Sequence, residues 1–148
     1  MSLERINMNE TTSNTRLIYV SANCIDSELL DKEIDAILSV AREHNKKNNI
    51  TGALLFNSGY FAQVLEGPEE AVEMLFERIQ EDKRHEGCVV LSCEEISKYS
   101  FSEWSMAYEG GDSEAKTHFS HLIKHSKSTG EVLSANEVFS VLFEHINQ

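Results

Sequence analysis

Three polar side chains are predicted close to one apolar layer of this protein: Tyr19, Asn45 and Gln63. Gln63 lies in the run FAQVLEG, where the two-residue period of a strand places its amide on the same face as Phe61 and Leu65. An amide buried without partners costs about 1–3 kcal/mol, so groups that satisfy its donors and its acceptor are expected beside it. A phenol and two amides at the rim of an apolar cleft suit a planar heterocycle with alternating donors and acceptors along its edge.

These three residues also have a purely structural explanation. Tyr19 and Gln63 would form a hydrogen-bonded pair inside a sheet, and Asn45 would be an ordinary residue at the C-terminal end of a helix. Residue types and spacing alone leave both interpretations open.

A basic group, Arg78, Arg84 and His85, lies at and beyond the end of a second predicted helix. Basic residues in this position complement the helix dipole. In so acidic a chain, an Arg-Arg-His group is equally suited to bind a phosphate. The pattern does not decide between these two roles.

Glu114, His118, His121 and His125 share one side of a predicted helix near the C-terminal end of the sequence. Histidines three or four residues apart can bind a transition metal. No cysteine or carboxylate elsewhere in the sequence completes a closed site, so a solvated helix face is the favoured interpretation and metal binding is left open.

The hydrophobic periodicity predicts a single α+β domain followed by a helical pair. The hairpin at residues 50–67 is apolar on both faces, which is typical of central strands covered above and below. The element order is a ferredoxin-like β-α-β-β-α-β core with a fifth strand, and the final helices are expected to cover the second face of the sheet. Strands are predicted near residues 17–23, 50–56, 60–67, 88–92 and 104–108, and helices near residues 27–43, 68–82, 113–125 and 134–146.

The composition excludes several classes of function. Among 148 residues, 25 are acidic and 13 are basic, and the net charge of −12 argues against nucleic acid as a partner. No apolar run approaches the roughly 20 residues that span a bilayer, so no membrane partner is expected, and the polar N-terminus predicts a cytoplasmic protein. Cys24, Cys88 and Cys93 form no CxxC pair and are predicted to be reduced and buried or partly buried. There is no P-loop, GxGxxG or nucleophile–base spacing, so we do not expect an enzyme.

With these residues in view, the sequence resembles the BLUF family of flavin-using blue-light sensors. The resemblance covers residues 16–108 and includes the spacing between its segments. Those segments are LIY at 17–19, HNKKNNITG at 44–52, FAQVLEG at 61–67, RIQEDKRH at 78–85 and WSM at 104–106.

The resemblance implies a non-covalently bound flavin between the two main helices, normally FAD with FMN as the alternative. Tyr19 would be the redox-active phenol, and Gln63 would lie between it and the N5/C4=O edge of the ring. The other implied roles are Asn45 at C4=O and N3–H, Arg78 and His44 near the opposite carbonyl, Ile37 against the ring, Arg84 and His85 toward the ribityl-phosphate arm, and Trp104 and Met106 on the strand that exchanges partners with Gln63. Position 44 is commonly Asn in the family, so His44 departs from the pattern.

In the family, blue light moves an electron and a proton from the tyrosine toward the flavin and back, and leaves the glutamine rotated or tautomerised. We therefore divide the sequence into a flexible tail (residues 1–14), a flavin-binding sensor domain (15–110) and a two-helix extension (111–148). The sensor is expected to signal through its last strand and the helical pair to a protein partner or to its own copies, as a homo-oligomer. The alternative is a ferredoxin-like small-ligand regulator or enzyme without photoactivity.

Overall fold

The computed structural model describes residues 13–57, 59–101, 107–109, 114–131 and 133–146. These residues form a five-stranded sheet in the order β4-β1-β3-β2-β5, in which β5 runs parallel to β2 and the other neighbours are antiparallel. The strands are β1 (Asn14–Asn23), β2 (Thr51–Phe56), β3 (Tyr60–Pro68), β4 (His85–Ile96) and β5 (Ala107–Glu109). The helices are the short 3-10 helix η1 (Ser27–Leu29), α2 (Leu30–Lys47), α3 (Glu69–Gln80), α4 (Glu114–Thr129) and α5 (Ala135–Ile146).

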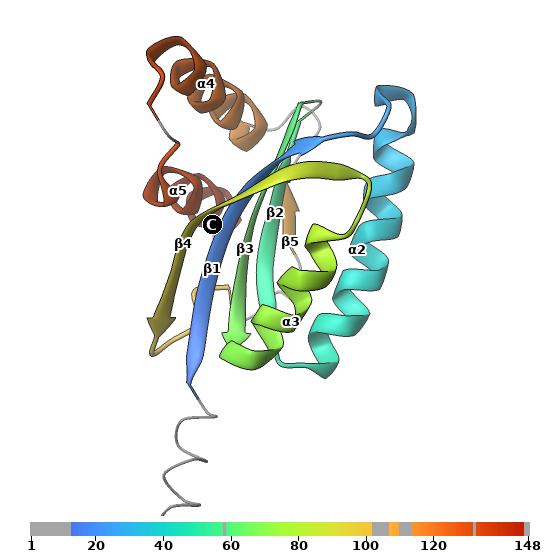
Figure 1. Ribbon diagram of the computed structural model, residues 1–148, viewed down its shortest axis with the longest axis vertical. Coiled ribbons are helices and arrows are strands. Elements are labelled where there is room, and N and C mark those ends of the chain that lie inside the picture. The colour runs from blue at the N-terminus through green and yellow to red at the C-terminus, as the bar shows by residue number, and fades with distance from the viewer. Residues whose placement is uncertain (1–12, 58, 102–106, 110–113, 132, 147–148) are drawn as a thin grey trace, which may run out of the picture.

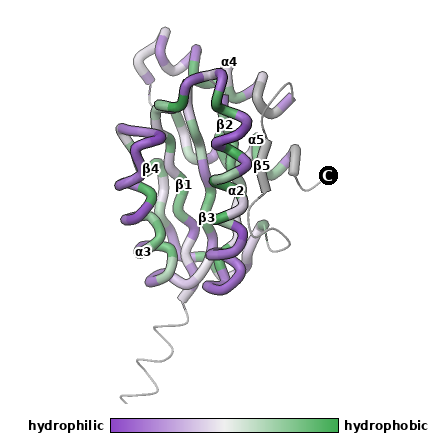
Figure 2. Tube along the Cα trace, turned by 90° about the vertical axis from the view of Figure 1, so that its right-hand side faces the viewer, coloured by the Kyte–Doolittle hydropathy of each residue, from purple (hydrophilic) through white to green (hydrophobic). Residues whose placement is uncertain are grey.

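The order and pairing of these elements confirm the predicted α+β, ferredoxin-like arrangement with a fifth strand and a helical pair. Helices α2 and α3 lie on one side of the sheet, and α4 and α5 lie on the other (Figure 1). Much of β1 and β3 is hydrophobic along its length, whereas α2 and α3 mix hydrophilic and hydrophobic residues (Figure 2). Because helices cover both faces of the sheet, the central hairpin has no polar side.

Strand alternation divides the interior into two cores. On the first face, Leu17 and Tyr19 of β1 pack with α2 and α3. On the second face, Ile18 of β1 packs with α4 and α5. The two-residue period therefore assigns each strand residue to one core, and Gln63 falls on the α2/α3 side as its parity predicts, with 7% of its surface exposed.

The hairpin depends on two local features. Asn57 Oδ1 accepts hydrogen bonds from the backbone N–H groups of Gly59 and Tyr60, which closes the turn between β2 and β3. A Cβ atom at Gly52 would lie 2.1 Å from the carbonyl oxygen of Val64, so only glycine permits β2 to approach β3 this closely.

Several element boundaries differ from the sequence prediction, and three of them bear on the elements around the cavity. Helix α2 continues to Lys47, so His44 and Asn45 belong to its last turns. Strand β4 is longer than residues 88–92 because its polar ends also pair with β1. Pro68 is the N-cap of α3 and not its first helical residue.

Candidate functional site

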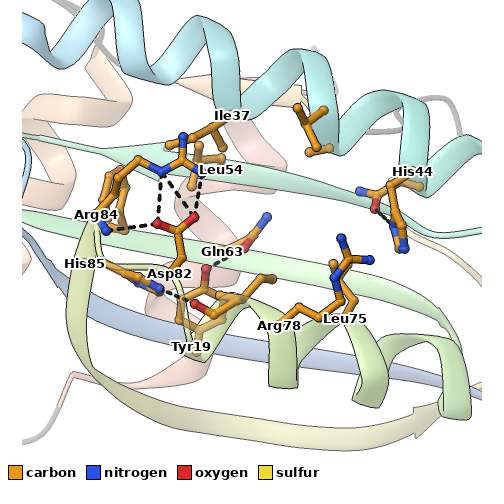
Figure 3. A pocket seen from close by; sticks show the side chains of 15 residues that line it. Tyr19, Ile37, His44, Leu54, Gln63, Leu75, Arg78, Asp82, Arg84 and His85 are labelled. Atoms are coloured by element: carbon orange, nitrogen blue, oxygen red, sulfur yellow. Dashed lines mark hydrogen bonds and ion pairs between the residues drawn. The ribbon is translucent and has the colours of Figure 1, made fainter.

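A cavity of about 240 Å³ lies between β1 and β3 on one side and α2 and α3 on the other (Figure 3). Its walls are largely apolar, and its polar side chains come from all four of these elements and from the segment after α3. The structure brings together here every residue for which a flavin-binding role is implied: Tyr19, Ile37, His44, Asn45, Gln63, Arg78, Arg84 and His85.

Tyr19 and Gln63 face each other across the β1–β3 ladder as directly opposite residues. The Tyr19 hydroxyl donates a hydrogen bond of 2.5 Å to Gln63 Oε1, and both side chains are buried. With its oxygen directed at Tyr19, the amide turns its nitrogen away from the phenol (Figure 3). The pair is therefore polarised, with the phenol as donor and the amide oxygen as acceptor.

Burial keeps the Tyr19 phenol neutral. Desolvation raises its pKa above the usual range, and the negative charges that Cys88 and Asp82 can carry raise it further. The Phe76 ring, with its centroid 5.3 Å from that of Tyr19, forms part of this apolar surrounding. A neutral phenol is the state that can donate the observed hydrogen bond to Gln63.

This shift in pKa predicts a loss of stability at alkaline pH. The unfolded state ionises Tyr19 near the ordinary tyrosine pKa of 10.0, whereas the folded state keeps the proton. Above that pH, Tyr19 should lower the free energy of unfolding by up to about 1.4 kcal/mol per pH unit. Urea unfolding of the protein and of Tyr19→Phe between pH 9 and 11 measures this difference, and parallel pH curves for the two would contradict it.

Asn45 lies at the C-terminal end of α2 with its side chain fully buried. Its backbone carbonyl accepts the N–H groups of Asn48 and Ile50, which ends the helix and fixes the residue. Its side-chain Oδ1 lies 3.3 Å from His44 Nδ1. The backbone of Asn45 thus performs the helix-terminal role, while its amide lines the cavity.

Arg84, one member of the basic group, already has an acidic partner in the folded chain. Arg84 forms a bidentate ion pair with Asp82, at 2.6 Å between Nη2 and Oδ2 and 2.9 Å between Nε and Oδ1. This hydrogen bonding holds the pKa of Asp82 below its usual range and raises the pKa of Arg84. Because Asp82 already balances its charge, Arg84 is poorly suited to act alone on a phosphate.

His85 has a structural function in addition to lining the cavity. Its Nε2 lies 2.6 Å from the carbonyl oxygen of Ile79, so this nitrogen carries the proton and donates. Its Nδ1 lies 2.7 Å from the hydroxyl of Ser21. His85 therefore ties the end of α3 to β1, and the ring is held beside Phe61 and Tyr19. The phosphate-arm role of Arg84 and His85 stays a prediction.

Asp82 is a cavity residue that the sequence analysis missed. Its Oδ1 also accepts the backbone N–H of Arg84, which is the hydrogen bond of an Asx turn. An aspartate two residues before an arginine just past a helix is the local signal that would have predicted it. The apolar wall residues Leu54, Phe61 and Leu75 carry no such signal, because a cavity-facing position and a core position have the same pattern.

Other candidate residues either fall outside the described residues or do not line the cavity. Trp104 and Met106 fall outside the described residues, although the described strand β5 pairs with β2 directly after them. His118, His121 and His125 are not part of the cavity, and within the ranges the structure describes no group of three potential ligands could hold a metal ion. The prediction of buried or partly buried cysteines agrees with half-buried Cys88 and is wrong for Cys24 and Cys93, which are exposed. Cys24 follows β1 in a loop, and Cys93 lies on the edge strand β4.

The described helices include none that combines the length and the apolar character needed to cross a bilayer. The cavity lies between the sheet and helices α2 and α3.

The lining of the cavity fits a flavin ring. Ile37 on α2 and Leu75 on α3 offer apolar surface on either side of the cavity, which suits a flat aromatic group. The amides of Gln63 and Asn45 and the guanidinium of Arg78 supply both acceptors and donors at its rim. This is the set that the ring carbonyls, N3–H and N5 of a flavin require.

Comparison with solved structures finds close matches over most of the chain. The photo-activated state of BlsA superposes with a TM-score of 0.73 at 34% sequence identity, covering 88% of this chain and 93% of that one. The dark-state structure of BlrB, a BLUF protein, matches with a TM-score of 0.70 at 28% identity, covering 90% of this chain and 95% of that one. A bacterial light-regulated adenylyl cyclase gives a TM-score of 0.69 at 31% identity, with 81% of this chain and 36% of that one covered.

Two curated relatives match over a shorter span. The blue light- and temperature-regulated antirepressor BluF of Escherichia coli K12 is 40% identical over 92 residues, 62% of this chain but only 22% of the relative. The photoactivated adenylate cyclase subunit beta of Euglena gracilis is 33% identical over 98 residues, 66% of this chain and 11% of the relative. The family described as sensors of blue light using FAD matches residues 15–107, more than half of the chain. The chain therefore belongs to the BLUF family of FAD-binding blue-light sensors.

Proposed function

We propose that Tyr19 and Gln63 form the light switch of this sensor. The observation that carries the proposal is their buried hydrogen bond, which lines the cavity that fits the flavin. Bound FAD supplies the absorption of blue light and a transient acceptor for an electron. Tyr19 would be the electron donor to that acceptor and would pass its hydroxyl proton toward Gln63 Oε1 along their hydrogen bond, and return of both would restore the dark state.

Gln63 would retain the light-induced change in hydrogen bonding because its amide has two ends of opposite hydrogen-bonding character. Rotation or tautomerisation exchanges the donor and the acceptor without moving a net charge. In a buried site each mismatched hydrogen bond is costly, so the new arrangement forces the neighbouring groups to adjust. A small change at one side chain then alters the sheet.

The other candidate residues of the cavity fall into two groups in this proposal, one that binds the ring and one that shapes the end of the cavity. Asn45, Arg78 and His44 would hydrogen-bond to the carbonyl and N3–H groups of the ring, and Ile37 would pack against it. Their support is that all of them line the same cavity as Gln63. Arg84 and His85 lie beyond them and shape the end of the cavity, with Arg84 held by Asp82.

Asn45→Ala should weaken flavin binding. We expect the affinity to fall about 5- to 30-fold, because an amide that makes two hydrogen bonds contributes about 1–2 kcal/mol net. Fluorescence titration of the apoprotein with FAD measures the dissociation constant. Asn48→Ala is the matched control, since Asn48 is exposed and its side chain donates to the His44 carbonyl instead of lining the cavity. Equal affinities for the two variants would remove Asn45 from the site.

The output of the sensor is proposed to be a protein contact. The Escherichia coli relative is named an antirepressor and the Euglena relatives are named cyclase subunits, so related domains serve different outputs. This sequence contains neither a P-loop nor a GxGxxG motif, and we infer a non-enzymatic sensor. Residues 15–110 would form the sensor domain, and residues 111–148 would contact the partner or a second copy of the chain. The net charge of −12 favours a partner with a basic docking surface.

Absorption spectroscopy tests the proposed switch directly. The FAD-loaded protein kept in the dark should show the flavin bands, blue light should shift them to longer wavelength, and darkness should reverse the shift. A preparation that binds FAD but shows no shift would contradict a photoactive Tyr19–Gln63 pair. A pull-down compared in darkness and under blue light then identifies the partner.

A further inference from the structure

A second polar group lies buried on the opposite face of the sheet from the flavin cavity. Glu66 of β3 is fully buried, and its Oε2 accepts a hydrogen bond of 2.8 Å from Arg16 Nε. Its Oε1 accepts the backbone N–H groups of Ser100 and Phe101 at 2.8 and 2.9 Å. The carboxylate thus joins β3 to β1 and to the chain that leads out of β4.

The Arg16–Glu66 pair joins the same two strands as the proposed switch. Tyr19 and Gln63 are directly opposite residues of the β1–β3 ladder, and so are Arg16 and Glu66. The two pairs lie three residues apart and on opposite faces, since odd and even positions of a strand alternate. Any shift of β3 against β1 that accompanies a change at Gln63 must therefore also act on the Arg16–Glu66 pair.

The same group contacts the C-terminal helices. The guanidinium carbon of Arg16 lies 4.6 Å from the centre of the Phe139 ring of α5. Phe101, whose N–H is held by Glu66, packs edge-to-face on Phe139 at 5.7 Å and on Phe143 at 6.2 Å between ring centroids. Helix α5 therefore rests on two residues that Glu66 holds in place.

The charge of Glu66 makes this arrangement sensitive to small displacements. A buried carboxylate is tolerated when donors surround it, and loss of one donor leaves a charge that is no longer compensated. Hydrogen bonds to a charged group are also stronger than neutral ones and depend on good geometry. Arg16 and the Ser100–Phe101 backbone are consequently expected to follow the carboxylate.

We propose that Glu66, clamped by Arg16 and by the N–H groups of Ser100 and Phe101, transmits the change at Gln63 through the sheet to α5. The proposal rests on the proposed function, because it takes the Tyr19–Gln63 pair as the origin of the change. It assigns Glu66 and Arg16 as positioning residues on the output side of the sheet, with no part in flavin binding or photochemistry.

The test separates the photoshift from the response of α5. Hydrogen exchange of residues 135–146 is measured on the full FAD-loaded chain in darkness and under blue light, together with its absorption. In Glu66→Gln the amide oxygen can still accept the backbone N–H groups of Ser100 and Phe101. The amide NH2 group, however, would face Arg16 Nε, and two donors cannot form a hydrogen bond with each other. We expect this variant to keep the photoshift. Its light-induced change in α5 exchange should be at least about fivefold smaller than in the unmodified chain, which is the lower end of typical coupling between sites. Glu94→Gln is the matched control, because Glu94 also pairs with Arg16, at 3.7 Å, but is 61% exposed.

Each outcome bears on one proposal. Absence of a photoshift in the unmodified chain would contradict the proposed switch. A photoshift without any light-induced change in α5, or an unchanged α5 response in Glu66→Gln, would overturn the role of Glu66. If Glu66→Gln does not fold, Phe139→Leu decides, since it removes the Arg16 contact from α5 and leaves Glu66 intact. It should keep the photoshift and reduce the α5 response, and a full response would overturn the proposal.

Discussion

Gln63→Leu is expected to abolish the light-induced red shift of the flavin bands while FAD stays bound. Leucine has nearly the same volume as glutamine and fits the apolar layer with Phe61 and Leu65. It has neither donor nor acceptor, so no hydrogen-bond exchange can follow excitation. It also leaves the Tyr19 hydroxyl without the acceptor that it now has, which costs about 1–3 kcal/mol. Difference spectra before and after illumination measure the effect, together with the flavin content of the purified protein.

The matched control is Gln80→Leu, which makes the same chemical change at an exposed position in the last turn of α3. This variant should keep a full photoshift. A normal shift in Gln63→Leu would show that the switch has been assigned to the wrong residue, whatever the control does.

Tyr19→Phe is expected to abolish the photoshift by a different route. Phenylalanine keeps the ring and its packing on Phe76 but removes the hydroxyl that donates to Gln63 Oε1. Without an oxidisable phenol beside the cavity, the excited flavin loses its nearest proposed electron donor, so its fluorescence should rise. Gln63 stays in place, and therefore FAD affinity should change little. Steady-state fluorescence and light–dark difference spectra distinguish this variant from Gln63→Leu.

Tyr60→Phe provides the comparison for Tyr19→Phe. Tyr60 begins β3 and packs against the other core, where Lys127 lies 4.8 Å from its ring centre. Removal of this hydroxyl should leave both the fluorescence and the photoshift unchanged. A Tyr19→Phe variant that behaves like Tyr60→Phe would contradict electron donation from Tyr19.

Local pattern was sufficient to predict the layers of this protein and the position of its central amide. The period of two in β3 put Gln63 among Phe61 and Leu65, and the structure has it there, bonded to Tyr19. The hairpin without a polar face required cover on both sides, and α2, α3, α4 and α5 supply it. These features follow from sequence because the side of a strand on which a residue falls depends only on its neighbours in the chain.

Partners from distant parts of the chain were decided by the tertiary structure alone. Nothing near Glu66 in the sequence predicts Arg16 opposite it, or the N–H groups of Ser100 and Phe101 at its other oxygen. Likewise, the basic pattern at residues 78–85 left a phosphate site and a helix-dipole role both open, whereas in the folded segment Arg84 pairs with Asp82. Parity gives the face on which a side chain lies, but the group that it meets depends on strand register and loop path. These are set by packing over the whole sheet.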